Sequence, residues 1–157
     1  MWRSPVQVWL EKTGQIEHVE DSEAMYWGRI LEDVVAKEFV ERTGKKVRRR
    51  HAILQHPSYP FMIANVDRMV VGEDAGLECK TAGAWSRDEW ANDAIPEEHV
   101  IQCQHYMAVT GLTRWYIAVL IGGQHFLWQA IERDEEIVGY LIQIEKDFWR
   151  LVETNVP

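Results

Sequence analysis

The stretch of residues 61–81 alternates in a way that predicts two antiparallel strands joined by a tight turn. In its first half, apolar side chains recur with the two-residue period of a β-strand. These residues are Phe61, Ile63, Met69 and Val71. The segment 72–76 begins and ends with glycine and has turn composition. We therefore expect residues 77–81 to fold back on the first strand as a hairpin.

Three charged residues of this hairpin indicate a metal site. Asp67 falls on the apolar face of the first strand, where a carboxylate is costly unless it is paired or bound to a cation. Glu78 and Lys80 are two residues apart and so share one face of the second strand. Carboxylate oxygens suit Mg²⁺ or Mn²⁺, and an amine can position or polarise an attacking water. The alternative is that all three are solvated or salt-bridged surface residues.

The length and composition favour one soluble globular domain over residues 1–157. The chain has 157 residues, of which 46% are apolar and 27% charged. No apolar run approaches the roughly 18 residues of a membrane helix, and the N-terminus lacks a secretory signal pattern. We therefore expect a cytoplasmic protein without membrane association. Cys79 and Cys103 both lie in apolar runs and are expected to be reduced core residues.

The charge distribution is uneven. A net charge of −8 argues against indiscriminate nucleic-acid binding, but a metal-dependent nuclease needs an acidic site. Positive charge is concentrated in residues 45–50, so Arg48, Arg49 and Arg50 are candidates for phosphate contacts. The alternative for this run is a solvated strand. Trp85 lies in a polar stretch and is a further candidate for contact with nucleic acid.

A long amphipathic helix is predicted for residues 24–43, ending at Gly44. Its expected core stripe is Trp27, Ile30, Leu31, Val34 and Val35. Glu32 lies off that stripe, with Gly28 one turn earlier on the same side. The glycine leaves backbone bare beside a carboxylate, which suits an approaching metal or phosphate. A solvated glutamate is the alternative.

The other predicted elements complete an α+β order. We expect a short helix ending at Gly14, a strand over 47–54, a loop over 82–95, a helix over 96–111, strands over 115–121 and 125–131, and a helix over 134–153. In the helix over 96–111, Gln104 sits inside the apolar stripe, whereas Gln102 and Tyr106 share another face. This order predicts a small mixed sheet flanked by helices.

The order and the motif together resemble a known family. A D…ExK pattern on consecutive strands, with an acid on the preceding helix, is similar to the PD-(D/E)XK nuclease superfamily. The chain most resembles the YqaJ-type phage recombinase nucleases and lambda exonuclease. The matching segments span most of residues 3–153 and include GRILEDVVAKEF, HPSYPFMIANVDRMV, GLECKT, IPEEHVIQCQHYMAVTG and WYIAVLIGGQHF.

The resemblance implies roles for particular residues. Asp67 and Glu78 would bind two Mg²⁺ or Mn²⁺ ions together with the backbone carbonyl of Cys79, and Glu32 would complete the metal shell directly or through water. Lys80 would orient or activate water. Family members also carry a glutamine motif on the next helix: Gln102 and Tyr106 fit its QxxxY form, whereas periodicity turns Gln104 toward the sheet. Both glutamines remain candidates, and Tyr106 is also a candidate for contact with DNA.

The resemblance also implies an activity and partners. It suggests an exonuclease that degrades linear duplex DNA from 5′ to 3′ in phage recombination, in the cytoplasm of a bacterial host. A ring-shaped homotrimer and a single-strand annealing protein as partner are further implications.

Three features depart from the family pattern. Val66 replaces the proline of the superfamily name. The chain begins too late for the upstream helix that helps relatives bind a 5′ phosphate, so strict selection of phosphorylated ends is not carried over. Two cysteines are too few for the four-cysteine iron–sulfur cluster of some relatives.

Two alternatives to an exonuclease stay open. A restriction-like endonuclease on the same fold would cut within the duplex. A catalytically inactive nucleic-acid-binding or assembly module would keep the fold alone.

Overall fold

The computed structural model describes residues 4–17 and 20–156, apart from the side chain of Asp67. The elements are α1 (Pro5–Lys12), α2 (Glu23–Thr43), β1 (Val47–Gln55), β2 (Ile63–Val70), β3 (Ala75–Ala82), the 3₁₀ segment η1 (Ala84–Asp93), α3 (Glu97–Thr110), β4 (Arg114–Ile121), β5 (His125–Glu132) and α4 (Glu135–Thr154). Within the described ranges, no helix is long and apolar enough to cross a membrane.

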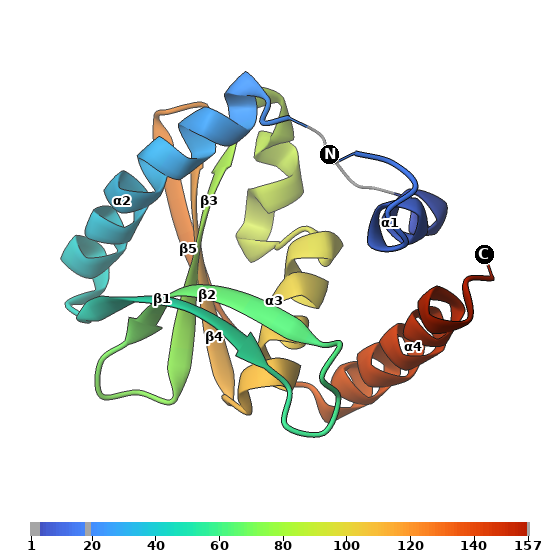
Figure 1. Ribbon diagram of the computed structural model, residues 1–157. Helices are drawn as coiled ribbons and strands as arrows, with labels where there is room; N and C mark the ends of the chain where they lie inside the picture. Colours follow the sequence, from blue (N-terminus) through green and yellow to red (C-terminus); the bar gives the residue numbers. More distant parts are fainter. Residues whose placement is uncertain (1–3, 18–19, 157) are drawn as a thin grey trace.

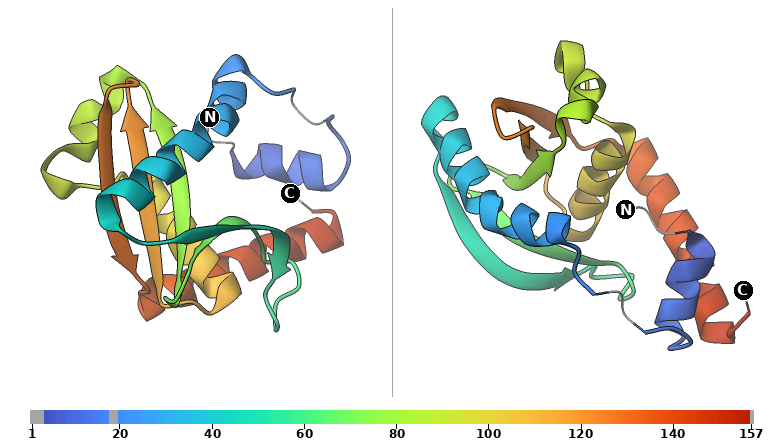
Figure 2. Two further views of the ribbon diagram at one scale, coloured as in Figure 1. Left: turned by 90° about the vertical axis from the view of Figure 1, so that its left-hand side faces the viewer. Right: turned by 90° about the horizontal axis from the view of Figure 1, so that it is seen from above.

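The five strands form one mixed sheet between two layers of helix (Figure 1). The strand order follows the chain from β1 to β5, and every neighbouring pair is antiparallel except the parallel pair β3 and β4. Helix α2 covers one face of this sheet, and α3 lies on the other (Figures 1 and 2). The expected α+β architecture is confirmed, and the segment predicted as a loop over 82–95 contains η1.

Helix α2 begins and ends as predicted but buries a different stripe. Ser22 caps its first turn by accepting a hydrogen bond from the backbone of Met25, and Gly44 ends it in the left-handed conformation. The predicted core residues Trp27, Ile30 and Val34 are about half exposed. The buried residues are Val35, Ala36 and Phe39. The stripe prediction is confirmed for Val35 and was wrong for Trp27, Ile30 and Val34.

Strand β2 changes its packing side at Asp67. Before that residue, Val66 packs in the core cluster that includes α3, but beyond it Val70 packs with α2. The pairing with β1 shifts at the same place, since Ala52 pairs with Val66 and Arg49 with Arg68. Two β1 residues therefore oppose the single residue Asp67, which is the arrangement of a β-bulge.

This irregularity overturns the predicted apolar face of the hairpin. Ile63 and Val71, expected in the core with Asp67, are about half exposed. Met62, Ala64 and Val66 are buried instead, and Met69 is buried as predicted. A strict two-residue period cannot hold across a bulge. The argument that Asp67 lies on a continuous apolar face was therefore wrong, although its backbone lies in β2 as expected.

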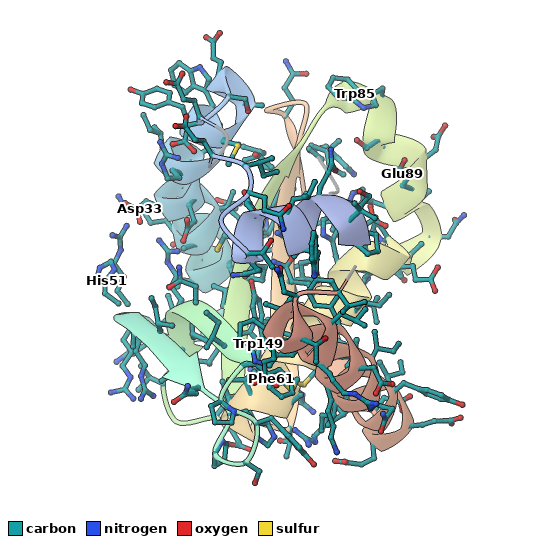
Figure 3. The ribbon with its side chains drawn as sticks, turned by 45° about the vertical axis from the view of Figure 1, so that its right-hand side comes forward. Asp33, His51, Phe61, Trp85, Glu89 and Trp149 are labelled. Carbon is teal, nitrogen blue, oxygen red and sulfur yellow. The ribbon has the colours of Figure 1, made fainter. Side chains whose placement is uncertain are left out.

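Helix α4 is fixed to the rest of the fold at several points. The indole of Trp9 in α1 donates a hydrogen bond to the backbone carbonyl of Leu151, with a distance of 3.2 Å from Nε1 to the oxygen. The rings of Phe61 and Trp149 stack with centroids 6.0 Å apart (Figure 3). These contacts hold α4 against α1 and the loop between β1 and β2.

His105 of α3 joins α4 to β2. Its Nδ1 lies 2.6 Å from Oε1 of Glu145, and its Nε2 lies 2.9 Å from the carbonyl oxygen of Ile63. A carboxylate and a carbonyl only accept hydrogen bonds, so both ring nitrogens donate and the imidazole is protonated. Burial lowers the pKa of His105, but the hydrogen bond and charge of Glu145 and the bond to Ile63 outweigh it, so the pKa is raised.

The His105 contacts are expected to stabilise the fold more in acid than in base. Because the folded pKa exceeds the unfolded value near 6.5, this contribution is complete below that value and disappears as pH rises through the folded pKa. His105→Gln should lower the free energy of unfolding at pH 6 by about 1.5–3 kcal/mol. Urea unfolding of both proteins from pH 5 to 9 should show the difference shrinking with pH. A difference that is constant or grows with pH would contradict the charged pair.

Candidate active site

Strand β3 places Glu78 and Lys80 on the side of the sheet covered by α3. Their partners on β4 are Ile117 and Val119, which pack in the core cluster that includes α3. The Nζ atom of Lys80 lies 3.1 Å from Oε1 of Glu78, and both side chains are partly exposed. The predicted sharing of one strand face by this acid and amine is confirmed.

The pairing of β2 with β3 brings Asp67 to the same region. Arg68 lies opposite Leu77, so Asp67 and Glu78 are the next residues along their two antiparallel strands. The side chain of Asp67 lies outside the described part of the structure. The backbone therefore supports the predicted neighbourhood, while the role of the Asp67 carboxylate as a ligand stays a prediction.

Glu32 of α2 is bound by an arginine that sequence analysis did not select. The guanidinium of Arg68 forms an ion pair with Glu32 and donates to Oδ1 of Asp33 at 2.5 Å. Arg68 is only 3% exposed, so its charge needs these carboxylates. Arg49 also pairs with Asp33. The sequence did contain a signal for these ion pairs, because Arg68 follows Asp67 directly in a strand that has a buried side.

Gly28 lies near the end of β3, and the approach of a metal or phosphate to its bare backbone stays a prediction. A Cβ atom built on Gly28 would lie 3.7 Å from the Thr81 hydroxyl oxygen. The first half of α2 therefore approaches β3 just beyond Lys80. Glu32, one turn later, is directed to Arg68 by its ion pair.

The two candidate glutamines of α3 have different surroundings. The amide of Gln104 is 2% exposed: it donates to the Glu132 carbonyl at 2.8 Å and accepts from the Asp134 backbone at 2.9 Å. Gln104 therefore joins the end of β5 to the start of α4. Gln102 instead donates to the hydroxyl of Tyr106 at 2.7 Å, and both are half-buried. Gln104 is thus occupied by backbone partners, and the role of Gln102 and Tyr106 at the candidate site stays a prediction.

A histidine and a tryptophan adjoin the site and were missed. His99 of α3 stacks on Trp90 of η1 with ring centroids 5.4 Å apart. Burial, and next the charge of Lys80, lower the pKa of His99 and outweigh the opposing charge of Glu98. Its Nδ1 is buried without a hydrogen-bond partner in the described part of the chain. His99 precedes Gln102 and Tyr106 by three and seven residues, and this helical spacing was the available signal.

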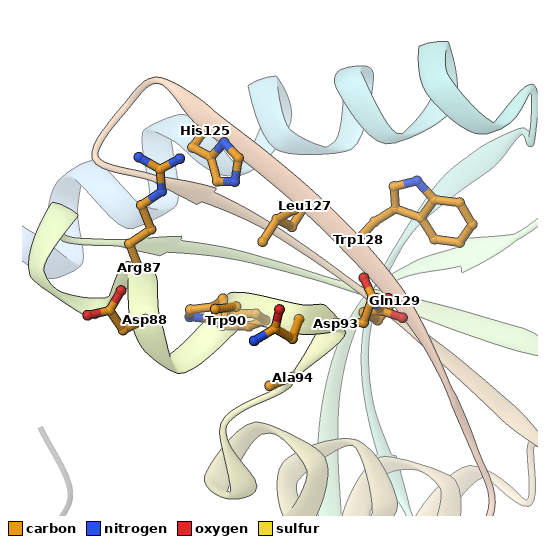
Figure 4. Close-up of a pocket in the computed structure, with 11 residues that line it drawn as sticks. Arg87, Asp88, Trp90, Asp93, Ala94, His125, Leu127, Trp128 and Gln129 are labelled. Atoms are coloured by element: carbon orange, nitrogen blue, oxygen red, sulfur yellow. The ribbon is translucent and has the colours of Figure 1, made fainter.

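A hollow of about 280 Å³ lies between η1 and β5, and Trp90 is one of the residues that line it (Figure 4). Its lining includes Arg87, Asp93, His125 and Gln129, but no residue predicted for the site. Asp93 has a positive φ of 61° and accepts a hydrogen bond from Gln129 at 3.1 Å. Trp90, which lines the hollow and stacks on His99, separates it from the region of Lys80.

The DNA-contact candidates are exposed to different degrees. Arg48, Arg49 and Arg50 are all exposed on β1, an edge strand of the sheet, but Arg49 is engaged by Asp33. Trp85 is almost fully exposed at the start of η1 (Figure 3). Tyr106 is half-buried and packs against Trp115, with ring centroids 5.1 Å apart.

The chemistry of the donors fits a hard divalent cation. Glu78 supplies a carboxylate and Cys79 a backbone carbonyl, and oxygen ligands of this kind suit Mg²⁺ or Mn²⁺. Within the described residues, no three His, Cys, Asp or Glu side chains form a group that could hold a metal. The Asp67 carboxylate lies outside the described part of the structure, so this statement does not cover it. Both cysteines are thiols rather than disulfides; Cys103 is buried as predicted, whereas Cys79 is only partly buried.

Solved structures that are similar to this chain include exonucleases. The chain matches the alkaline exonuclease LHK-Exo of Laribacter hongkongensis with a TM-score of 0.81 and 19% identity, covering 96% of this chain and 78% of that one. The same enzyme in complex with dAMP matches at 0.81 with 21% identity and the same coverage. A phage-related exonuclease of Haemophilus somnus 129PT matches at 0.78 with 13% identity, covering 96% and 79%. These likenesses define the fold as a PD-(D/E)XK-like exonuclease fold.

The sequence itself shows the family. Residues 1–113 match the YqaJ-like viral recombinase domain, so the chain belongs to that family. A protein of Bacillus subtilis (strain 168) described as uncharacterized protein YqaJ is 53% identical over 151 residues, which cover 94% of this chain and 47% of the relative. The chain therefore spans about half the length of that curated relative. The resemblance predicted from the motifs is confirmed for both family and fold.

Proposed function

We propose that the protein is a divalent-metal-dependent deoxyribonuclease that degrades linear duplex DNA from its ends. The single observation that carries this is the Glu78–Lys80 pair on β3, at the point where Asp67 lies on the neighbouring strand. Membership of the YqaJ-like viral recombinase domain family and the fold of known exonucleases support the same function. A recombination role in a bacterial cytoplasm, a 5′ to 3′ direction, a ring trimer and an annealing partner are further parts of this proposal.

The residues divide the work in the proposed reaction. Asp67, Glu78 and the Cys79 carbonyl hold one or two Mg²⁺ or Mn²⁺ ions, which supply activation of water and neutralisation of phosphate charge. Lys80 holds the attacking water, or stabilises the charge that develops on phosphorus, through its amine donors. Gln102 orients a group at the site from α3. Glu32 acts at the edge of the metal shell, through water, because Arg68 already occupies one of its oxygens.

The surface arginines of β1 provide the phosphate contacts. Arg48 and Arg50 are exposed on an edge strand, and neither has an ion-pair partner in the described part of the chain. Arg49 already neutralises Asp33. The net charge of −8 makes such a local basic strip the natural place for a DNA backbone to dock.

Neutralising Arg48 or Arg50 is expected to weaken DNA binding and its dependence on salt. Each alanine variant should reduce the slope of log K against log [salt] by about 0.9, the value for one released counterion. Arg49→Ala is the matched control and should change the slope less, because its guanidinium is paired with Asp33. Binding is measured by anisotropy at several NaCl concentrations without divalent metal. Unchanged slopes for Arg48→Ala and Arg50→Ala would show that these arginines do not contact phosphates and are ordinary solvated surface residues.

The activity is tested with linear and closed circular DNA in parallel. A linear duplex labelled at either end should lose nucleotides in the presence of Mg²⁺ or Mn²⁺, and the label released first gives the direction. Closed circular DNA should stay intact. Nicked or linearised circles would instead identify an endonuclease, and no hydrolysis of any substrate would identify an inactive binding module.

A further inference from the structure

Trp85 presents a large aromatic ring to solvent immediately beyond the candidate active site. It is 88% exposed and lies in the first turn of η1, which follows β3 directly (Figure 3). Two residues after Lys80 the strand ends at Ala82, so Trp85 continues the same stretch of backbone. Burying so exposed a tryptophan against a ligand would gain hydrophobic free energy, so its position just after β3 makes it a candidate for contact with the substrate.

The indole of Trp85 lies against the backbone of Gly83. A Cβ atom on Gly83 would lie 2.2–2.5 Å from atoms of the six-membered ring of Trp85, so the ring rests on bare backbone. The backbone of Gly122 donates to the Ala82 carbonyl at 2.8 Å, and a Cβ there would lie 3.1 Å from that of Ala84. The turn between β4 and β5 therefore anchors the start of η1. The six-membered ring of the indole approaches Gly83, and most of the side chain is open to solvent.

The surroundings of the ring favour a nucleobase over a protein partner. Protein interfaces form on continuous apolar patches. The next residues of η1 are Ser86, Arg87, Asp88 and Glu89, and the last three are exposed and charged. An exposed aromatic ring that is followed in the chain by polar groups is instead the kind of surface on which single-stranded nucleic acids stack their bases.

We propose that Trp85 is a stacking platform for an unpaired nucleobase at the DNA end that occupies the candidate active site. The proposal rests on the proposed function and adds a preference for ends with unpaired nucleotides. A base separated from its partner would lie on the open face of the indole, next to the phosphate at Glu78 and Lys80. Gly83 is then a positioning residue, because it alone lets the ring lie flat.

The test measures binding to two DNA duplexes in the Glu78→Ala background, which removes hydrolysis. One duplex carries short single-stranded overhangs, and the other has terminal base pairs that are covalently cross-linked. Trp85→Ala should weaken binding to the overhang duplex by roughly 5- to 100-fold and leave the cross-linked duplex within about twofold. Trp85→Phe should retain most of the affinity. Tyr140→Ala removes another exposed aromatic ring, on α4, and should change neither.

Gly83→Ala provides an independent variant that keeps the indole. The backbone angles at residue 83, φ −70° and ψ 157°, suit alanine, so the only conflict is the contact with the ring. It should reproduce the loss of overhang binding while thermal unfolding stays close to that of the parent.

Three results would overturn the stacking platform. If Trp85→Ala weakens binding to both duplexes equally, Trp85 is a general DNA contact. If binding to both is unchanged, Trp85 does not belong to the site. If binding is unchanged but the oligomeric state of the variant differs, Trp85 is a protein contact. None of these affects hydrolysis of linear DNA by the wild type, which tests the proposed function separately. Absence of both DNA binding and hydrolysis in the wild type would overturn both.

Discussion

Glu78→Ala is expected to reduce divalent-metal-dependent hydrolysis of linear DNA to background. The carboxylate is the described acid at the candidate metal site, and it lies 3.1 Å from Lys80 on the same face of β3. The loss should exceed the roughly 10³-fold effect of removing a single electrostatic donor, because a lost ligand removes the cation as well. Release of labelled nucleotide with Mg²⁺ and with Mn²⁺ measures it. Asp67→Ala should have a similar effect.

The protein should remain folded when Glu78 is removed. Glu78 and Lys80 are both partly exposed, so Lys80 can be solvated when its partner is lost. Glu132→Ala is a matched control, because Glu132 is also a strand glutamate in an ion pair, with Arg114. That variant should hydrolyse DNA normally. Full activity of Glu78→Ala, or equal loss in Glu132→Ala, would remove Glu78 from the site.

The succession of elements could be predicted because local signals agree with the fold. Ser22 and Gly44 mark the two ends of α2, and the structure uses both as caps. Strands β4 and β5 were recognisable as apolar runs separated by Gly122 and Gly123, both of which have positive φ. The segment η1 was missed because a 3₁₀ helix with a kink at Asn92 has no regular apolar period.

Burial was harder to predict than the elements themselves. The apolar stripe of α2 was assigned on the assumption that its apolar side chains are buried along the whole helix, but Trp27 is half exposed and the fully buried residues are Val35, Ala36 and Phe39. On β2, a bulge opposite Asp67 reverses the side on which the strand packs. Neither the reach of a helix over a sheet nor a local shift in register is encoded in hydrophobic periodicity.

Some residues of the candidate site could be predicted from local spacing, and others could not. Glu78 and Lys80 were found because their spacing in one strand fixes a shared face. The contact of Arg68 with Glu32 joins elements far apart in the chain, and that of His99 with Trp90 joins an irregular 3₁₀ segment to the next helix, so no local pattern shows them. Gln102 and Gln104 were separated only by tertiary partners, since the carbonyl of Glu132 occupies Gln104.

Lys80→Ala is expected to slow hydrolysis by roughly 10²–10³-fold while leaving metal binding largely intact. An ammonium group has three donors and no acceptor, so at neutral pH it can hold an attacking water or stabilise phosphate charge but not ligate a cation. Removing it takes a positive charge from beside the Glu78 carboxylate, so affinity for Mn²⁺ should stay the same or rise. Lys80→Met keeps the length of the side chain without its charge and should behave in the same way.

Calorimetric titration with Mn²⁺ separates these roles when wild type, Lys80→Ala, Lys80→Met and Glu78→Ala are compared. Only Glu78→Ala should lose affinity, whereas all three variants should lose hydrolysis. The physical reason is that a ligand acts on the cation and Lys80 acts on the reacting groups beside it. If the Lys80 variants lose Mn²⁺ as completely as Glu78→Ala does, then the amine is needed to hold Glu78 in place. Its role would then be to position the ligand, and the assignment to water or phosphate would be wrong.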